Sequence, residues 1–314
     1  MTQHQAFTLP PGAPSIDEMI AAERRRARKR LWTALAFMAP AILFVTVFLL
    51  LPVLFNVYAS LTQWAKFSGI DQFAGLANYQ RLASNPKFLD ATLNTVIWVA
   101  VSFVLPATIG LSLAMLVRGV PGEETFKSIF FLPRMFSATA VGVVWYYVYA
   151  TEGIVNAGLR SVGLGDLASR WLYETHLATP AMIVTHIWQQ VGLMMVLLLI
   201  GLNALPSEPM EAAKVDGASR SQVFRHILLP LLMPTLIMVT TVSVLAGFTS
   251  FDLVWVMGRD FPNRSTLTLS VYQYWESFRA GSWAYGAAIA VVLGIIAMSI
   301  SWSLGALQHR LDKR

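Results

Sequence analysis

Two apolar stretches of the sequence carry polar or small residues at the spacing of one helix face. Within each set the members recur three or four positions apart, which places them along a single side of an α-helix. The two sets are His186, Gln189, Gln190 and Leu193 in the first stretch, and Ser243, Ala246, Gly247 and Ser250 in the second. Neutral donors and acceptors can hydrogen-bond to hydroxyl groups, and glycine and alanine leave room for a solute. The two stripes therefore predict a pathway for a hydroxyl-rich small molecule.

Direct packing between helices is the alternative interpretation of the same residues. His, Gln and Ser side chains also hydrogen-bond across apolar helices, and the two interpretations fit any one residue equally well. Taken together, the stripes favour the pathway, because polar groups within an apolar span usually face a bundle interior or a water-filled cavity.

A loop at residues 203–229 is suited to docking a partner rather than to catalysis. Pro206 and Pro209 stop the preceding helix, and Ser207 stands where it could cap a new short helix that runs to about Asp216. The sequence therefore predicts a short helix in this loop, before the chain enters the next apolar stretch.

The second half of this loop predicts a turn and then another helix. Gly217 permits the left-handed conformation that commonly ends a helix. Ser219 and Gln222 have the spacing of a capping box, which predicts a second helix that leads into the following apolar stretch. Glu211 lies at the positive end of the first helix, and the small Ala212 and Ala213 let another surface approach closely.

The sequence contains no recognisable catalytic or metal-binding pattern. There are no cysteines, and no phosphate-binding pattern of the type G-x-x-x-x-G-K-[ST] occurs. No nucleophile stands at a suitable spacing from a base. The five histidines lack metal-ligand spacing and are His4, His176, His186, His226 and His309. We therefore expect a chain that is not an enzyme and that binds no cofactor of its own.

Long runs without charged residues predict the elements that carry these groups. Hydrophobic residues make up 56% of the chain and charged residues 13%, whereas about a quarter of the residues of an average soluble domain are charged. The runs cover residues 31–65, 91–117, 135–151, 175–207, 226–251 and 280–309. Five of them exceed the roughly 20 residues that a helix needs to cross a bilayer, and the third nearly reaches that length. The sequence therefore predicts an all-α polytopic membrane protein with six transmembrane helices.

The distribution of basic residues predicts the orientation of the spans. A basic cluster precedes the first span and consists of Arg24, Arg25, Arg26, Arg28, Lys29 and Arg30. Basic residues that flank a span stay on the cytoplasmic side, so both termini are expected in the cytoplasm. A nucleic-acid partner is excluded, because the cluster adjoins a span and has no aromatic interleaving, and lipid headgroups are the expected neighbours.

The chain is thus predicted to contain a cytoplasmic N-terminal segment, a six-helix membrane domain and a cytoplasmic tail, at residues 1–30, 31–307 and 308–314. A short separate helix is expected within the first segment, from about Ile16 to Arg30.

The loop at 203–229 resembles, without a gap, the EAA loop of ABC-importer permeases. The matching residues are Glu211-Ala212-Ala213, Asp216-Gly217-Ala218 and Ile227-Leu228-Leu229-Pro230. From about Leu31 onward, the chain is similar to the carbohydrate-uptake branch of this family, on the side of the larger permease subunit of the maltose transporter. The segments that carry this similarity include Gly75-Leu76-Ala77-Asn78-Tyr79, Phe130-Phe131-Leu132-Pro133, and Gly153 with Asn156.

The resemblance implies a type I ABC-importer permease fold in the bacterial inner membrane. It implies a coupling helix that fits a cleft on a dimeric ABC ATPase, formed by Glu211, Ala212, Ala213, Asp216 and Gly217. That ATPase, and not this chain, would bind ATP and Mg²⁺. The resemblance also implies a second homologous permease, a periplasmic or extracytoplasmic solute-binding protein, and a sugar-like small molecule as partners. This chain would form half of the translocation pathway for that molecule. The two stripes resemble the sugar-contacting positions of the family.

An ATP-independent secondary transporter or channel is the rival function. Ion-coupled carriers usually keep Asp, Glu or Lys within the membrane, whereas the predicted spans contain no charged residue apart from Arg134 at an edge. Arg134 could line the pathway or contact an anionic group of a substrate. The sequence favours a third role, in which its side chain reaches to the cytoplasmic headgroups.

Overall fold

The computed structural model describes residues 16–248, 250–258 and 265–311, and the regular elements in this part of the chain are helices. The all-α prediction is therefore confirmed. The chain divides into two units, residues 1–55 and 56–314. Residues 1–15 and 312–314 of the predicted terminal segments lie outside the described residues.

The first unit contains one unbroken helical stretch. Helix α1 (Ile16–Val45) continues through a single π-helical turn, η1 (Thr46–Leu50), into α2 (Leu51–Ser60), which extends into the second unit. The prediction of a separate short helix that ends near Arg30 is wrong. The basic cluster contains residues of high helix propensity and no helix breaker, so the helix runs on into the apolar segment. Apolar side chains such as Phe37 and Phe48, which are 84% and 71% exposed, cover its surface.

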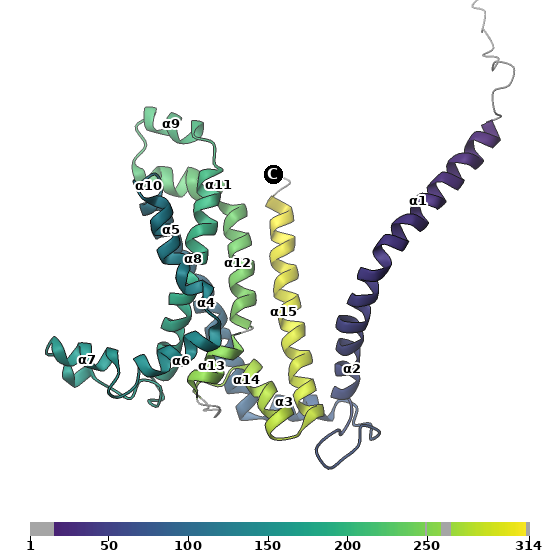
Figure 1. Cartoon of the computed structure of the whole chain (residues 1–314), viewed down its shortest axis with the longest axis horizontal. Helices are drawn as coiled ribbons and strands as arrows, with labels where there is room; N and C mark the ends of the chain where they lie inside the picture. Colours follow the sequence, from purple (N-terminus) through teal and green to yellow (C-terminus); the bar gives the residue numbers. More distant parts are fainter. Residues whose placement is uncertain (1–15, 249, 259–264, 312–314) are drawn as a thin grey trace, which may run out of the picture. The chain divides into compact units, whose positions relative to one another are not determined.

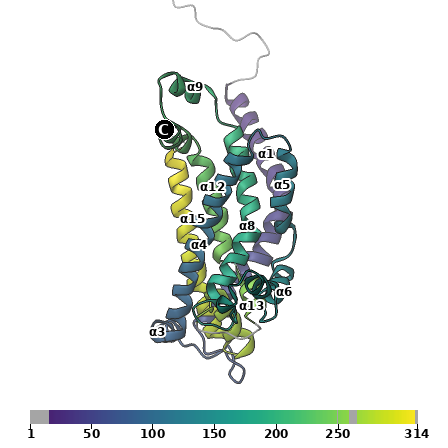
Figure 2. The ribbon, with the colours of Figure 1, turned by 90° about the vertical axis from the view of Figure 1, so that its left-hand side faces the viewer.

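Three helices form the centre of the second unit. Helix α4 (Pro86–Val117) packs against α8 (Ala178–Asn203) and α12 (Met233–Phe248), as Figures 1 and 2 show. Helix α15 (Trp283–Leu311) packs against α12. Asn85 begins α4 by accepting a hydrogen bond from the Lys87 amide, and Pro86 occupies the first helical position, where no amide donor is needed.

Two of the six predicted spans are bent helix pairs. Helix α5 (Glu123–Phe131) and the 3₁₀ turn η2 (Leu132–Met135) meet α6 (Ala138–Val148) at 93°. Helix α10 (Arg220–Val223), the π turn η4 (Phe224–Leu228) and α11 (Leu229–Leu231) meet α12 at 68°. The described residues contain four helices long enough to cross a membrane, and the number reaches the predicted six when each bent pair counts as one span.

The first of these bends has a local cause. Pro133 lies in η2, and Phe136 adopts an extended conformation after it. The Ser137 hydroxyl then accepts a hydrogen bond from the Ala140 amide and starts α6 as a new helix. The expected third span over 135–151 is therefore not one continuous helix.

The short helices of the second unit lie at its two ends (Figure 1). At one end, which we call the α9 end, lies α9 (Glu208–Val215). The opposite end, the α3 end, carries α3 (Ala77–Ser84), α13 (Phe251–Met257), α14 (Leu269–Tyr274) and the π turn η5 (Trp275–Arg279). Helix α7 (Ile154–Ser161) and the 3₁₀ turn η3 (Gly165–Leu167) follow α6.

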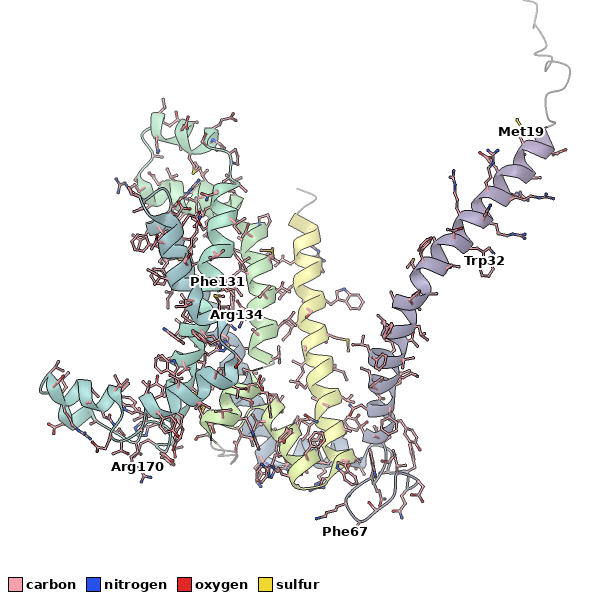
Figure 3. The ribbon with its side chains drawn as sticks, viewed as in Figure 1. Met19, Trp32, Phe67, Phe131, Arg134 and Arg170 are labelled. Atoms are coloured by element: carbon pink, nitrogen blue, oxygen red, sulfur yellow. The ribbon has the colours of Figure 1, made fainter. Side chains whose placement is uncertain are left out.

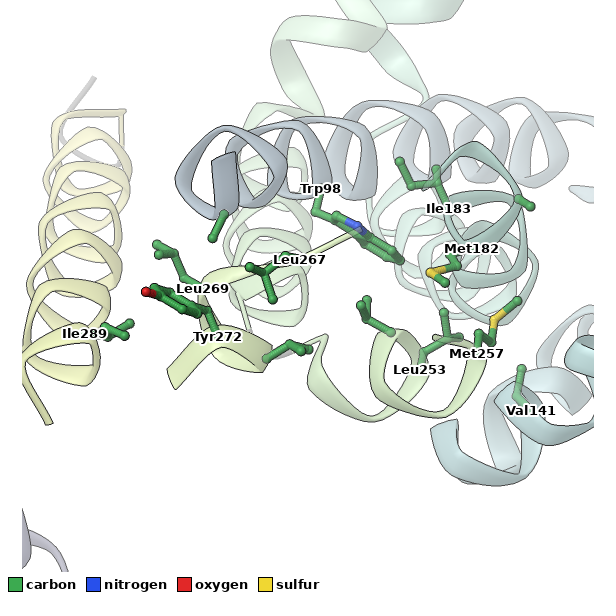
Figure 4. Packing of buried hydrophobic residues seen from close by; sticks show 14 of the residues in the cluster. Trp98, Val141, Met182, Ile183, Leu253, Met257, Leu267, Leu269, Tyr272 and Ile289 are labelled. Atoms are coloured by element: carbon green, nitrogen blue, oxygen red, sulfur yellow. The ribbon is translucent and has the colours of Figure 1, made fainter. Parts of the chain in front are cut away.

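Two hydrophobic clusters hold the second unit together. The cluster nearer the α3 end includes Trp98, Met182 and Tyr272, and Figure 4 shows how side chains from several helices meet there. The cluster nearer the α9 end includes Met194 and Leu232 and joins α4, α8 and α12. Because lipid tails are as apolar as these side chains, close van der Waals packing between the helices stabilises each cluster where it lies within the membrane.

Candidate functional site

Helix α9 begins where the sequence predicts it, although one detail of its start differs. Ser207 occupies the N-cap position, and Pro209 lies in the first turn. The Ser207 side chain makes no capping hydrogen bond, so the predicted cap is wrong. Its backbone is already in the helical region, whereas a side-chain cap requires the extended geometry that turns the hydroxyl back toward the helix.

A left-handed glycine ends α9. Gly217 has a φ of 75°, and its amide donates to the Lys214 carbonyl. The Ala218 amide reaches back to the Ala213 carbonyl at 2.9 Å, which completes a Schellman motif. The predicted turn at Gly217 is confirmed. A Cβ at this position would meet no neighbouring atom, so the glycine is required by its backbone conformation and not by crowding.

The predicted capping box follows this turn directly. The Ser219 hydroxyl accepts from the Gln222 amide at 3.3 Å, and the Gln222 side chain accepts from the Ser219 amide at 2.7 Å. Both bonds start α10. The segment from α9 to α10, residues 207–223, is therefore a pair of short helices with defined ends, and we call it the α9 loop.

The outer side of the α9 loop is open to contact. Glu211, Ala212, Asp216 and Gly217 are exposed, and Val215 is 87% exposed. Glu211 forms no ion pair with any residue in the described part of the chain. The loop thus presents a free carboxylate and an apolar side chain on a protruding helix, while Ala213 is the one member of the predicted docking set that is buried.

The inner side of the α9 loop is attached to the bundle. Met210 of α9 and Phe224 of η4 pack against the hydrophobic cluster that contains Met194 and Leu232. Displacement of α9 would therefore act directly on side chains of α8 and on the start of α12.

The stripe on α8 lies inside the bundle. His186, Gln189 and Gln190 are 4%, 3% and 5% exposed, and Leu193 is half-buried. The Gln189 amide nitrogen donates to the Phe136 carbonyl at 3.0 Å and so ties the middle of α8 to the bend between η2 and α6. The bond gives the Phe136 carbonyl a partner, which this carbonyl lacks within the described helices because the span is broken between η2 and α6.

The stripe on α12 faces its neighbouring helices. The Ser243 hydroxyl contacts the Met194 sulfur of α8 at 3.3 Å. The predicted place of Ser250 on the same helix face is wrong, because α12 ends at Phe248 and Ser250 stands with a non-helical backbone at the N-cap of α13. The Ser250 hydroxyl bonds back to the Gly247 carbonyl. A Cβ at Gly247 would lie 3.0 Å from the Val99 Cα of α4, so this glycine permits close packing. Ala246 is half-buried. Helix packing thus accounts for Ser243 and Gly247, and a contact of this stripe with solute stays a prediction.

The contact between α4 and α8 contains polar atoms without partners. We call four buried polar residues of these two helices the α4–α8 seam: Trp98 and Ser102 of α4, and His186 and Gln190 of α8. Ser102 also borders Gly247 of α12. Among the described residues, no hydrogen-bond partner is found for Trp98 Nε1, Ser102 Oγ, His186 Nε2 or Gln190 Oε1. The Trp98 and His186 rings meet edge to face with centroids 5.4 Å apart. Because an unsatisfied buried polar atom is costly, this seam is suited to water molecules or hydroxyl groups.

Sequence analysis identified only the α8 half of this seam. Trp98 and Ser102 are four positions apart, the spacing of one helix face, within the charge-free run 91–117. That spacing could have indicated them, but two residues in a long apolar run give a weaker signal than the stripe on α8.

The bend at η2 is the third feature of this region. Gly192 of α8 lies so close to it that an added Cβ would overlap the Phe130 carbonyl oxygen. Arg134 lies within η2, and its side chain is exposed (Figure 3). The structure therefore brings Arg134 beside the polar middle of α8, a proximity that the sequence did not predict.

Comparisons with known proteins give a consistent result. Residues 107–314 match the family model described as binding-protein-dependent transport system inner membrane component. A probable ABC transporter permease protein of Pyrococcus horikoshii is 32% identical over 266 residues, which cover 84% of this chain and 91% of that protein. The multiple sugar-binding transport system permease protein MsmF of Streptococcus mutans is 31% identical over 296 residues, or 92% of this chain and 98% of that protein.

A solved structure shows the same fold. It is a chain of a bacterial ABC transporter involved in the import of the acidic polysaccharide alginate. The match has a TM-score of 0.77 with 21% sequence identity, and it covers 92% of this chain and 99% of that chain.

Proposed function

This chain belongs to the family of binding-protein-dependent transport system inner membrane components and is an ABC-transporter permease, and we propose that it carries a sugar or sugar-like solute. The relative from Streptococcus mutans, named for multiple sugars, supports this solute class. Neutral polar groups of the α4–α8 seam, for which the described residues supply no hydrogen-bond partner, are suited to hydroxyl groups.

The α9 loop is the proposed coupling element. The combination of an exposed and an attached side carries this proposal. The outer side of α9 presents the exposed Glu211 carboxylate and ends in a Schellman turn. On its inner side, Met210 packs against the hydrophobic cluster that contains Met194 and Leu232. A separate dimeric ATPase that binds ATP and Mg²⁺ would contact Glu211, Ala212 and Gly217. Its closure would move α9, and the cluster would pass that motion to α8 and α12.

Other partners complete the pathway. The family description implies a solute-binding protein, which would deliver solute at the α3 end. A second homologous permease would supply the other wall of the pathway, because one chain of this size provides only half of it.

The proposed orientation places the α9 end and both termini in the cytoplasm. The chain contains no cysteine, so single cysteines can report the sides of the membrane without background. We expect a membrane-impermeant thiol reagent to label Phe67→Cys, at a 93% exposed side chain, only from outside. Val215→Cys should be labelled only in inverted vesicles. Labelling of Val215→Cys from outside would contradict both the orientation and the coupling role.

Coupling is tested in proteoliposomes that contain the complete importer and its binding protein. We expect Glu211→Ala and Gly217→Val to lower ATP-driven uptake at least tenfold while the complex still assembles and hydrolyses ATP. The matched control is Glu124→Ala, because Glu124 is an 88% exposed carboxylate on α5, outside the α9 loop. Unchanged uptake in both α9-loop variants would refute the coupling role.

The proposed solute pathway includes Gln189 and Ser250, with the rest of the two stripes. Replacing either residue by Ala should change the ratio of uptake rates across a panel of sugars and leave assembly intact. A uniform loss for every sugar would assign the residue to helix packing instead.

A further inference from the structure

Arg134 occupies an unusual position for a charged residue of a membrane protein. It lies in η2, and the bend that follows η2 is tied to α8 by the hydrogen bond from Gln189 to the Phe136 carbonyl. Gln189 is the twelfth of the 26 residues of α8, so this level is roughly 15 Å or more along the helix from either end. Figure 3 shows Arg134 between the two ends of the bundle. The expected contact with cytoplasmic headgroups stays a prediction, and from this level it requires the Arg134 side chain to extend toward the α9 end.

Arg134 has no counter-charge in its surroundings. No Asp or Glu stands in residues 125–151, 175–207 or 217–251, which form α6, α8 and α12 and most of α5. Within the described part of the chain, its guanidinium forms no ion pair. A charged side chain within a membrane usually faces the bundle interior or a water-filled cavity and pairs there with an opposite charge.

The backbone that carries Arg134 is held firmly. Gly192 allows α8 to lie against the Phe130 carbonyl on one side of η2, and Gln189 binds the Phe136 carbonyl on the other. Arg134 therefore stands, with its side chain exposed, on a turn whose backbone is fixed against α8 on both sides. Such a prepared position favours binding, because little ordering is needed when a ligand arrives.

An apolar groove begins two residues after Arg134. It has a volume of about 190 Å³ and is lined by Phe136, by side chains of α6 that include Trp145, and by Trp188 of α8. The Trp145 and Trp188 rings meet edge to face with centroids 5.5 Å apart. Aromatic faces of this kind accept the apolar face of a sugar ring. Gln189 of the α8 stripe reaches the edge of this groove, because it donates to the backbone carbonyl of Phe136.

We propose that Arg134 binds an anionic group of the transported solute, and that the solute is an acidic sugar with a carboxylate or a phosphate. This inference rests on the proposed function of a sugar permease. The guanidinium can form two parallel hydrogen bonds with either group, which a neutral hydroxyl cannot match.

The test compares neutral sugars with their acidic counterparts in proteoliposomes that contain the complete importer and its binding protein. The panel pairs glucose with glucuronate and with glucose 6-phosphate, and pairs neutral oligosaccharides with the corresponding uronates. We expect the wild type to take up at least one acidic member faster than its neutral partner. Arg134→Gln should lower uptake of that acidic solute by about tenfold or more and uptake of neutral sugars less than twofold. Arg134→Lys should restore part of the acidic uptake, because it keeps the charge.

Arg170→Gln is the matched control, because Arg170 is an exposed arginine outside the apolar helices that stacks on Tyr173. It should leave the acidic preference unchanged. Equal loss of neutral and acidic uptake in Arg134→Gln would assign the guanidinium to a lipid phosphate or a partner carboxylate and overturn the inference. If the wild-type importer takes up neutral sugars faster than their acidic counterparts, the inference about Arg134 is overturned, whereas the proposed function as a sugar permease still holds. If no sugar is taken up with ATP, the proposed function itself fails.

Discussion

The α9 loop and the α4–α8 seam are built in opposite ways. The hydrogen bonds that shape the α9 loop join residues at most five positions apart, as between Ala213 and Ala218, and its outer side chains are exposed. The seam joins residues of two distant helices, such as Trp98 and His186, and buries polar atoms that no described residue satisfies. The loop thus satisfies its own hydrogen bonds, whereas the seam retains hydrogen-bonding capacity that water or a hydroxyl group could fill.

This difference fits the two tasks that we propose for these regions, coupling for the α9 loop and solute passage for the seam. A coupling element has to keep its shape while it is pushed, and local hydrogen bonds provide that shape. A solute pathway has to exchange partners, and unmet hydrogen-bonding capacity favours the exchange. The hydrophobic cluster around Met194 connects the two regions, because Met210 of the loop packs against it.

The largest expected effect concerns the packing beside the seam. In Gly192→Ala the new Cβ would overlap the Phe130 carbonyl oxygen, so α8 and α5 would have to separate. We expect a loss of about 3 kcal/mol in stability, the upper part of the range for overpacking. The melting temperature of the purified importer in detergent measures it. Gly294→Ala in α15 is the control, because its Cβ would meet no atom of the described chain. Equal losses in the two variants would show that α8 can yield at this point.

The next effect concerns the attachment of the α9 loop. Met210→Ala should cost about 1 to 2 kcal/mol, less than for a fully buried side chain, because Met210 is half-buried. The cost should appear as faster amide hydrogen exchange in residues 207–218. Val215→Ala removes an exposed side chain from the same helix and should change little. If the amides of residues 207–218 exchange at the wild-type rate in both variants, Met210 does not attach the α9 loop to the hydrophobic cluster as we infer.

The turn at Gly217 should produce a smaller and purely local effect. Gly217→Ala forces an L-residue into the left-handed region at a cost of about 1 kcal/mol, without a steric clash. Gly217→Asn should cost less, because asparagine tolerates this conformation. Hydrogen exchange of the Ala218 amide reports the Schellman bond. Equal exchange rates in Ala and Asn variants would mean that the backbone angle does not limit this turn.

The smallest expected effect is a pH-dependent change in melting temperature, and it concerns Glu276 at the α3 end. Burial raises the pKa of the Glu276 carboxyl, although Arg81 and Lys87 act in the opposite direction, as does a hydrogen bond from Tyr272. A carboxyl with a higher pKa in the folded state favours folding below its unfolded pKa, and this contribution is lost as the pH rises through the folded pKa. Glu276→Gln should therefore raise the melting temperature slightly at pH 7 and not at pH 4.

Glu152 provides a control of opposite sign for Glu276. A hydrogen bond from Arg160 lowers the pKa of the Glu152 carboxyl, so its small stabilisation is present above the unfolded pKa and is lost as the pH falls. Glu152→Gln should lower the melting temperature at pH 7 more than at pH 4. The same pH trend in both variants would show that burial does not decide the behaviour of Glu276.

The sequence alone determined the features whose interactions are short in range. Charge-free runs predicted the apolar helices, since each helix satisfies its own backbone. The turn at Gly217 and the capping box at Ser219 were predictable because their donors and acceptors lie within five positions. The spacing of the α8 stripe was likewise visible in the sequence, since one helix face is a local property.

Only the tertiary structure decided what those faces meet. The sequence did not reveal that Trp98 and Ser102 complete the seam with His186, or that α12 turns Gly247 toward α4. The sequence also did not predict that Arg134 lies level with the middle of α8. This position depends on the bend between η2 and α6, where Gln189 donates to the Phe136 carbonyl. Such contacts join residues far apart in the chain, and close packing between helices, rather than local propensity, selects among the many pairings that a run of apolar residues permits.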